Sequence, residues 1–260
     1  MTAASAVPAR HRFTVLLLLS LSVPALAQVP DGQRARDIIE KADDLMRGKT
    51  LRAEMTLEIV RPDWSRQLAF KFWSKGRDYT LTYISAPAKE KGQAFLKRQN
   101  ELWNWVPAIN RMVKVPPSMM GQSWMGSDFT NDDLVKESSI LVDFDHALAG
   151  EDTVQGRPCW KIELTPKEDA AVVWGRVLTW VDRETYIQYR IERYDEDLEL
   201  VNTQAAGQVR QMGGRLVATR LEIVPADNPG QRTVMTVKKA VFDEPLAARF
   251  FSQQNLKWVR

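Results

Sequence analysis

The stretch that decides the fold is Leu51-Arg52-Ala53-Glu54-Met55-Thr56-Leu57-Glu58-Ile59. Apolar side chains occupy every second position from Leu51 to Ile59, and Arg52, Glu54 and Glu58 stand between them. In an extended chain, successive side chains point to opposite faces. The stretch therefore predicts a β-strand with one apolar face and one polar face.

The same period of two continues through most of the chain. It recurs at Leu68, Phe70 and Phe72, at Tyr79, Leu81 and Tyr83, and then in the ranges 94–99, 101–106, 111–115, 152–154, 159–165, 175–182, 187–194, 199–209, 216–224 and 233–242. Turn-forming residues such as Gly213-Gly214 separate many of these runs. Such short links predict antiparallel hairpins. A sheet of this size either pairs with a second sheet or curls toward a barrel.

One helix is predicted over residues 32–47. Asp31 can cap its start, and Gly48 ends it. Apolar residues between them are spaced by three and four positions, which gives one apolar stripe. No repeat or low-complexity linker divides the chain after this helix, so we expect residues 28–260 to form a single domain.

The first 27 residues have the composition of a cleaved signal peptide. Arg10 and Arg12 precede an apolar run from Phe13 to Val23, and Ala25-Leu26-Ala27 offers small residues for cleavage. The alternative is a membrane anchor, but the run falls short of the roughly 20 apolar residues that span a bilayer. We therefore expect a soluble periplasmic protein.

Composition excludes several classes of function. The net charge is +3, and cleavage would remove two arginines, so nothing indicates a nucleic-acid partner. Cys159 is the only cysteine, which rules out an intramolecular disulfide. His146 is the only histidine after the signal segment, so a metal site or a catalytic triad would depend on it alone. A Cys159–His146 pair is conceivable, but Cys159 lies in an alternating run where a packed cysteine is favoured. We expect no cofactor and no metal.

Aromatic pairs on the predicted strands indicate an apolar surface. Each pair shares one face of its strand, and the pairs are Phe70 with Phe72, Tyr79 with Tyr83, and Trp103 with Trp105. If these faces line one curved sheet, they form an apolar pocket that suits acyl chains. The alternative is the filled core of a β-sandwich, which the pattern alone slightly favours.

An irregular segment over residues 115–126 favours the pocket. It combines two prolines and two glycines with Met119, Met120, Trp124 and Met125. Methionine is the adaptable side chain of promiscuous apolar surfaces, and long apolar loops are commonly functional. We expect these four residues near the entrance of the cavity.

Asp128, Asp132 and Asp133 are the best candidates for catalytic or metal-binding carboxylates. They lie in a short predicted helix over residues 128–134, capped by Thr130, and capping explains such acids better than catalysis does. No phosphate-binding loop, nucleophile elbow or metal-ligand spacing is present in the sequence. We therefore expect no enzymatic activity.

At this point the sequence resembles a known family. The stretches 102–111 and Trp124-Met125-Gly126-Ser127-Asp128-Phe129 are similar to the LolA-like outer-membrane lipoprotein-sorting proteins. Gly156 to Trp160 and the closing run Phe250-Phe251-x4-Leu256 agree with this pattern. The resemblance implies a single curved antiparallel sheet, an incomplete β-barrel of about eleven strands plugged by short helices.

The resemblance also implies a function. It indicates a periplasmic carrier that moves acyl chains of a lipoprotein or another hydrophobic molecule between the inner and outer membranes. Its partners would be an inner-membrane exporter of the RND or ABC type and an outer-membrane acceptor. Two alternatives remain open: a docking module for such an exporter, and a hydrolase of envelope lipids or glycans that uses the Asp128 cluster.

Overall fold

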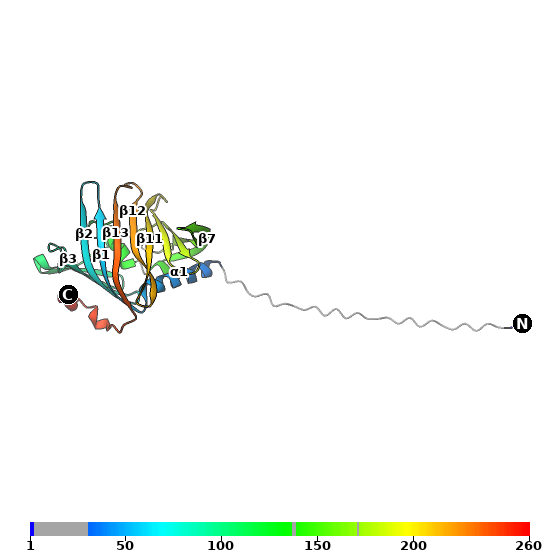
Figure 1. Cartoon of the computed structure of the whole chain (residues 1–260), viewed down its shortest axis with the longest axis horizontal. Coiled ribbons are helices and arrows are strands. Elements are labelled where there is room, and N and C mark those ends of the chain that lie inside the picture. The colour runs from blue at the N-terminus through cyan, green and yellow to red at the C-terminus, as the bar shows by residue number, and fades with distance from the viewer. Residues whose placement is uncertain (3–30, 137–138, 171) are drawn as a thin grey trace.

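Thirteen strands form one continuous sheet in the computed structural model, which describes residues 1–2, 31–136, 139–170 and 172–260 (Figure 1). The strands are β1 (Thr50–Val60), β2 (Ser65–Lys75), β3 (Tyr79–Ala86), β4 (Ala94–Arg98), β5 (Glu101–Val106), β6 (Arg111–Lys114), β7 (Phe144–Val154), β8 (Arg157–Pro166), β9 (Arg176–Asp182), β10 (Gln188–Tyr194), β11 (Leu200–Met212), β12 (Arg215–Pro225) and β13 (Arg232–Phe242). The order across the sheet is β6-β5-β4-β3-β2-β1-β13-β12-β11-β10-β9-β8-β7, with every neighbouring pair antiparallel. The first and last strands are therefore neighbours at the centre.

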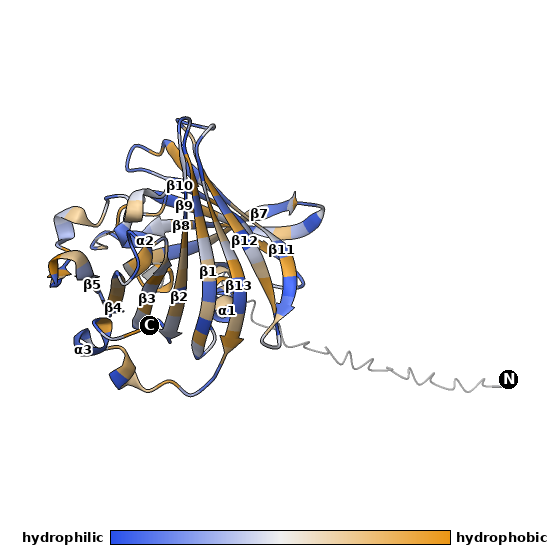
Figure 2. Cartoon of the chain, turned by 60° about the vertical axis from the view of Figure 1, so that its left-hand side comes forward, coloured by the Kyte–Doolittle hydropathy of each residue, from blue (hydrophilic) through white to orange (hydrophobic). Residues whose placement is uncertain are grey.

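The alternation of residues 51–59 gives β1 two unlike faces. Leu57 pairs with Leu68 on β2 and with Met235 on β13, which continues the apolar face across the centre of the sheet. Apolar and polar bands alternate along these strands in Figure 2. We call the face that carries Leu57 and Leu68 the inner face and the opposite one the outer face.

Helix α1 (Asp31–Arg47) covers one part of the inner face. Its apolar stripe of Ala35, Ile38, Ile39 and Ala42 packs against residues of β7, β8 and β9. Gly48 ends the helix at a φ of +63°, where its N–H donates to the Asp44 carbonyl at 2.9 Å. The sequence prediction of this helix is confirmed, with Asp31 as its first residue rather than its cap.

The segment between β6 and β7 covers another part of the inner face. It contains the 3-10 turns Pro117–Met119 and Trp124–Gly126, helix α2 (Asn131–Lys136) and the turn Ser139–Leu141. Trp124 packs in a cluster with Leu57 and Phe70, and Phe129 and Leu134 pack against that cluster. The inner face is thus covered by α1 over the β7–β9 side and by this segment over the β1–β5 side.

Residues 243–260 cross the outer face as a C-terminal segment with a 3-10 turn, Ala248–Phe250, and helix α3 (Gln253–Leu256). In Figure 1 the C-terminal end lies beside β3. The segment buries Phe251, Leu256 and Val259 against a second apolar cluster on β2 to β5, so both faces of this half of the sheet are covered.

The predicted fold class, a curved antiparallel sheet with few helices, is confirmed, but the sheet has thirteen strands in the described residues rather than about eleven. Each of the thirteen period-two runs of the sequence corresponds to one of these strands, so the lower number came from the resemblance alone. β7 begins at Phe144, before its predicted run at residues 152–154, because a bulge near Gly150 interrupts the alternation. The predicted signal peptide, residues 1–27, lies almost entirely outside the described residues. Of the helices that are described, none has the length and apolarity needed to cross a bilayer.

Candidate functional site

A cavity of about 210 Å³ lies between the inner face, helix α1 and the segment that carries α2. Its wall is formed mainly by apolar side chains from both coverings and from the central strands. Among them are Met46, Leu51, Met55, Phe70, Phe72, Trp124, Phe129, Leu134, Ile187, Ile191, Ala206, Ala218, Leu221, Met235 and Val237. The chain thus encloses a pocket that favours an apolar ligand.

Trp124 forms one wall of this cavity. It is 2% exposed, and its ring packs edge-on against Phe70 and Phe95 with centroid distances of 6.1 and 5.4 Å. Edge-to-face packing at this spacing adds stability beyond the area buried. Trp124 therefore joins the β6–β7 segment to the sheet and closes the cavity on that side.

Three methionines line the cavity from three different elements. Met46 comes from α1, Met55 from β1 and Met235 from β13. Methionine is unbranched and changes rotamer easily, so these positions can adjust to ligands of different shape.

A second cavity of about 90 Å³ lies next to the first and shares Asp43, Asp133, Gln188 and Ile191 with it. Its own apolar wall comes from Ile39, Ile140, Phe144, Val172, Trp174 and Val177. The two apolar cavities are therefore adjacent, and three of the residues that line both are polar: Asp43, Asp133 and Gln188. We call these three residues the polar junction.

The two carboxylates of the polar junction, Asp43 and Asp133, lie near arginine side chains. Asp43 accepts from Arg47 and from Arg77, each at 2.8 Å. Arg193, which is 9% exposed, donates to the side-chain oxygens of Asn202 and Gln204, both at 3.2 Å, and its Nε lies 3.9 Å from Asp133. Burying a charged group without such partners would cost several kcal/mol of stability.

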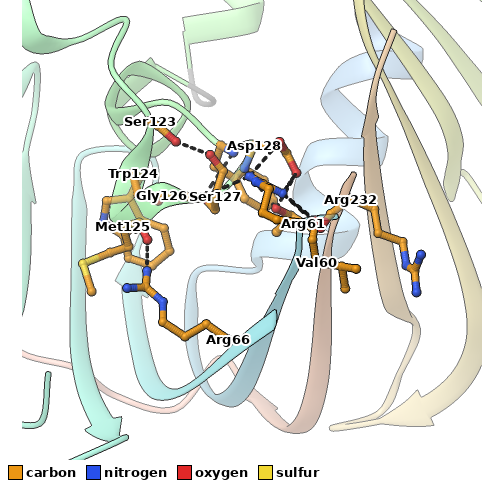
Figure 3. Close-up of polar contacts among 12 residues, drawn as sticks. Val60, Arg61, Arg66, Ser123, Trp124, Met125, Gly126, Ser127, Asp128 and Arg232 are labelled. Carbon is orange, nitrogen blue, oxygen red and sulfur yellow. Dashed lines mark hydrogen bonds and ion pairs between the residues drawn. The ribbon is translucent and has the colours of Figure 1, made fainter. Parts of the chain in front are cut away.

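The β6–β7 segment is tied to the sheet by polar contacts around Asp128 (Figure 3). The Arg61 guanidinium donates to Asp128 Oδ1 and to the Gly126 carbonyl, both at 3.0 Å. The Thr233 hydroxyl donates to Asp128 Oδ2 at 2.6 Å. Arg66 also donates to the Met125 carbonyl. These contacts hold the turn that presents Trp124 to the cavity.

A family model described as that of an uncharacterized protein matches residues 76–258. No curated protein matches the chain in sequence. A DUF1329 family protein from Desulfovibrio piger has a TM-score of 0.80 and 23% identity, over 88% of this chain and 100% of that one.

Two further solved structures have the same architecture. A putative outer membrane lipoprotein-sorting protein domain from Vibrio parahaemolyticus has a TM-score of 0.77 and 19% identity, over 87% of this chain and 99% of that one. A LolA superfamily protein from Nitrosomonas europaea has a TM-score of 0.73 and 22% identity, over 85% of this chain and 98% of that one. The chain belongs to the matched family, and its fold is LolA-like. At these identities, the likeness to the solved structures is one of fold.

In this LolA-like chain, the six predicted cavity residues divide between the two faces. Phe70 and Phe72 line the cavity. Tyr79, Tyr83, Trp103 and Trp105 do not: they lie on the outer face, where they pack with the C-terminal segment. The reason is the register of the β2–β3 hairpin, in which Lys75 faces Tyr79 beside the turn and Phe72 faces Thr82. Thr82, rather than Tyr83, therefore shares the inner face with Phe72.

The four residues predicted at the entrance have unequal positions. Trp124 is buried in the cavity wall, and Met120 and Met125 are partly buried against the same cluster. Only Met119 is largely exposed, at 40%. The irregular segment of the LolA-like fold therefore contributes to the wall of the cavity more than to an entrance.

The acidic candidates have structural partners. Thr130 and Asp133 form a reciprocal cap for α2: the Thr130 N–H donates to Asp133 Oδ2 at 2.7 Å, and the Asp133 N–H donates to Thr130 Oγ1 at 3.0 Å. Asp128 pairs with Arg61, and Asp132 lies in the wall of the second cavity. The predicted helix is confirmed over Asn131–Lys136, with Thr130 as its cap.

Cys159 and His146 lie far apart. Cys159 faces Asp152 of β7, whereas His146 lies on the same strand six residues before Asp152, about 20 Å away at about 3.3 Å per residue. Burial raises the pKa of the Cys159 thiol, as expected of a packed cysteine. Burial also lowers the pKa of His146, whose Nε2 lies 3.0 Å from the Ile140 carbonyl. They form no nucleophile–base pair.

Sequence reasoning missed the cavity residues of α1, β11 and β13. Met46, Gln204, Met235 and Val237 all line the first cavity. The alternation of β13 placed Met235 and Val237 on one face, but nothing in the pattern said that β13 would lie beside β1. Met235 and Val237 reach the cavity because β13 pairs with β1, with Met235 opposite Leu57.

Proposed function

We propose that this protein is a periplasmic carrier that binds acyl chains of a lipoprotein or another lipid in the cavity beneath α1 and α2. It would move this cargo between the inner and outer membranes without catalysing a reaction. The observation that carries the proposal is the apolar cavity itself, with its wall of Met46, Met55, Met235, Phe70 and Phe72. Such a wall offers an acyl chain apolar contact, and the acidic groups that reach it, Asp43 and Asp133, have partners in Arg47, Arg77 and Arg193.

The size of the cavity adds a requirement. Its volume of about 210 Å³ is below the roughly 300–1,000 Å³ of common ligand pockets, so the cavity must widen to accept a long chain. The methionines can change rotamer, and Phe129 and Leu134 belong to a segment that packs onto the sheet rather than pairing with it. Both features allow widening without breaking the sheet.

Energetics explains why a carrier is needed. Exposing a sixteen-carbon acyl chain to water costs on the order of 12 kcal/mol, at about 0.8 kcal/mol per CH₂. A protein cavity replaces membrane contact with protein contact and removes most of this barrier. The donor would be an inner-membrane exporter of the RND or ABC type and the acceptor an outer-membrane component, as the resemblance to the LolA-like proteins implies.

Phe72 offers the sharpest test, because it lines the cavity and is only partly buried. Phe72→Asp would set an unpaired carboxylate against the acyl chain, which costs several kcal/mol, so binding of a fluorescent fatty acid should weaken at least about a hundredfold. Phe72→Leu keeps the wall apolar and should bind within a few-fold of the parent. Circular dichroism checks that both variants are folded.

A folded Phe72→Asp variant that binds as tightly as the parent would contradict the proposed site. Native mass spectrometry of protein taken from its own periplasm, with extraction of bound lipid, tests the cargo separately. Absence of any lipid there, together with capture of an exporter subunit, would favour the docking-module alternative.

A further inference from the structure

The exposed side of the C-terminal segment combines one bare tryptophan with basic side chains. Trp258 is 69% exposed, and Lys257 and Arg260 beside it are also exposed. A groove of about 490 Å³ on this segment is lined by Leu246, Ala247, Arg249, Phe250, Ser252, Gln254, Asn255 and Trp258. No acidic residue is among the described residues that line it. We call Arg249, Lys257, Trp258 and Arg260 the tryptophan surface.

Trp258 is exposed although the chain on both sides of it is anchored. Leu256 is 1% exposed and Val259 is 6% exposed, and both pack into the outer-face cluster. The backbone N–H of Trp258 donates to the backbone carbonyl of Asn255 at 2.9 Å. The indole ring is therefore held away from the protein by an ordered backbone.

Two lysines of β2 fix the segment to the sheet from below. Lys75 Nζ donates to the Leu246 carbonyl at 2.8 Å, and Lys71 Nζ donates to the Arg260 carbonyl at 3.4 Å. The same strand sends Phe70 and Phe72 to the cavity on the other face, so β2 connects the two sites.

We propose that the tryptophan surface docks the protein on a membrane that contains anionic phospholipid. Tryptophan prefers the boundary between hydrocarbon and headgroups, and flanking lysines and arginines are attracted to anionic headgroups. A protein interface would need a larger apolar core, whereas this segment exposes one large ring. A single ring with three cations suits shallow insertion into a bilayer surface. This inference goes beyond cargo binding and does not depend on it.

The test is sedimentation of the protein from the periplasmic fraction with vesicles. Vesicles of phosphatidylethanolamine and phosphatidylglycerol in equal parts should bind it, and vesicles of phosphatidylcholine alone should not. Removing both charges in Lys257→Gln/Arg260→Gln should weaken partitioning about 25-fold, at about fivefold per basic residue. Trp258→Ala should also weaken it. Raising NaCl from about 0.1 M to about 1 M should release the parent, because the Debye length falls from about 10 Å to about 3 Å.

Matched controls come from a different part of the chain. Lys89→Gln/Lys91→Gln removes the same charge from the exposed loop between β3 and β4, and Trp64→Ala removes another half-exposed tryptophan from the β1–β2 turn. Both should bind vesicles like the parent, and all variants should keep their affinity for fluorescent fatty acid.

The proposal is overturned if the parent does not bind the anionic vesicles, or if the tryptophan-surface variants bind them as the parent does. A loss of fatty-acid binding by Phe72→Asp with normal vesicle binding would leave the two proposals independent.

Discussion

At the residue scale, the aromatic side chains of β2 that line the cavity and those of β5 lie on opposite faces of the sheet. Phe70 and Phe72 do share a face, and so do Trp103 and Trp105. The two pairs nevertheless lie on opposite faces, because the β2–β3 turn pairs Phe72 with Thr82, and the pairings from β3 through β4 to β5 place Trp103 and Trp105 in line with Leu81 and Tyr83. That register arises from pairing, which no single strand encodes.

His146 gives a residue-scale prediction about pH. Burial lowers its pKa in the folded protein below the ordinary value of 6.5, so the unfolded chain binds the proton more readily. Stability from this group is therefore present above pH 6.5 and is lost as the pH falls below it. We expect urea midpoints to fall between about pH 7 and about pH 5, above the range in which exposed carboxylates titrate.

The control for this effect is His146→Gln, which removes the titrating group while keeping a polar side chain near the Ile140 carbonyl. Its urea midpoint should vary less over the same pH range. An unchanged pH profile in this variant would mean that other groups set the acid sensitivity.

At the scale of elements, helix and strand positions follow closely from periodicity and turn residues. Helix α1 ends at the predicted glycine, and every predicted strand exists. The boundaries differ where a bulge interrupts the alternation, as at Gly150 in β7. What the pattern could not supply is the neighbour of each element, since β1 pairs with β13 across almost the whole chain.

Gly48 links α1 to β1 and gives a prediction at this scale. Its φ is +63°, and a Cβ there would lie 2.8 Å from Asp243 Oδ1. Gly48→Ala should lower the free energy of unfolding by about 2 kcal/mol, from backbone strain plus this close contact. Gly76→Ala is the comparison, because Gly76 has a φ of +53° but nothing within 4 Å of the added Cβ. It should cost about 1 kcal/mol. Equal losses in urea denaturation would argue that the contact near Asp243 is relieved.

At the scale of the whole molecule, the β6–β7 segment is the part that completes the cavity, and Asp128 is its main polar tie. The Arg61–Asp128 side chains are 13% and 12% exposed. Asp128→Ala would leave Arg61 poorly paired, and we expect a loss of about 2–3 kcal/mol in the free energy of unfolding. In this variant, amides around Trp124 should exchange hydrogen faster than in the parent, whereas those of β1 and β2 should exchange as in the parent.

The matched control is Glu101→Ala, which removes an ion pair with Lys114 whose side chains are 48% and 49% exposed. Such a pair contributes about 0–1 kcal/mol, so stability should barely change. Similar losses in Asp128→Ala and Glu101→Ala, or unchanged exchange near Trp124, would show that Asp128 does not hold the segment.

The adjacency of β1 and β13 also determines when the centre of the sheet can form during folding. Leu51 pairs with Phe242, so the centre of the sheet cannot close until the chain is nearly complete. Contacts between such distant residues form late, because the intervening loop must lose its entropy first. A chain that emerges from its N-terminus would therefore stay open at the centre of the sheet until β13 has followed. The same delay leaves the apolar face of β1 exposed until then, so the emerging chain depends on rapid completion or on a chaperone to avoid aggregation.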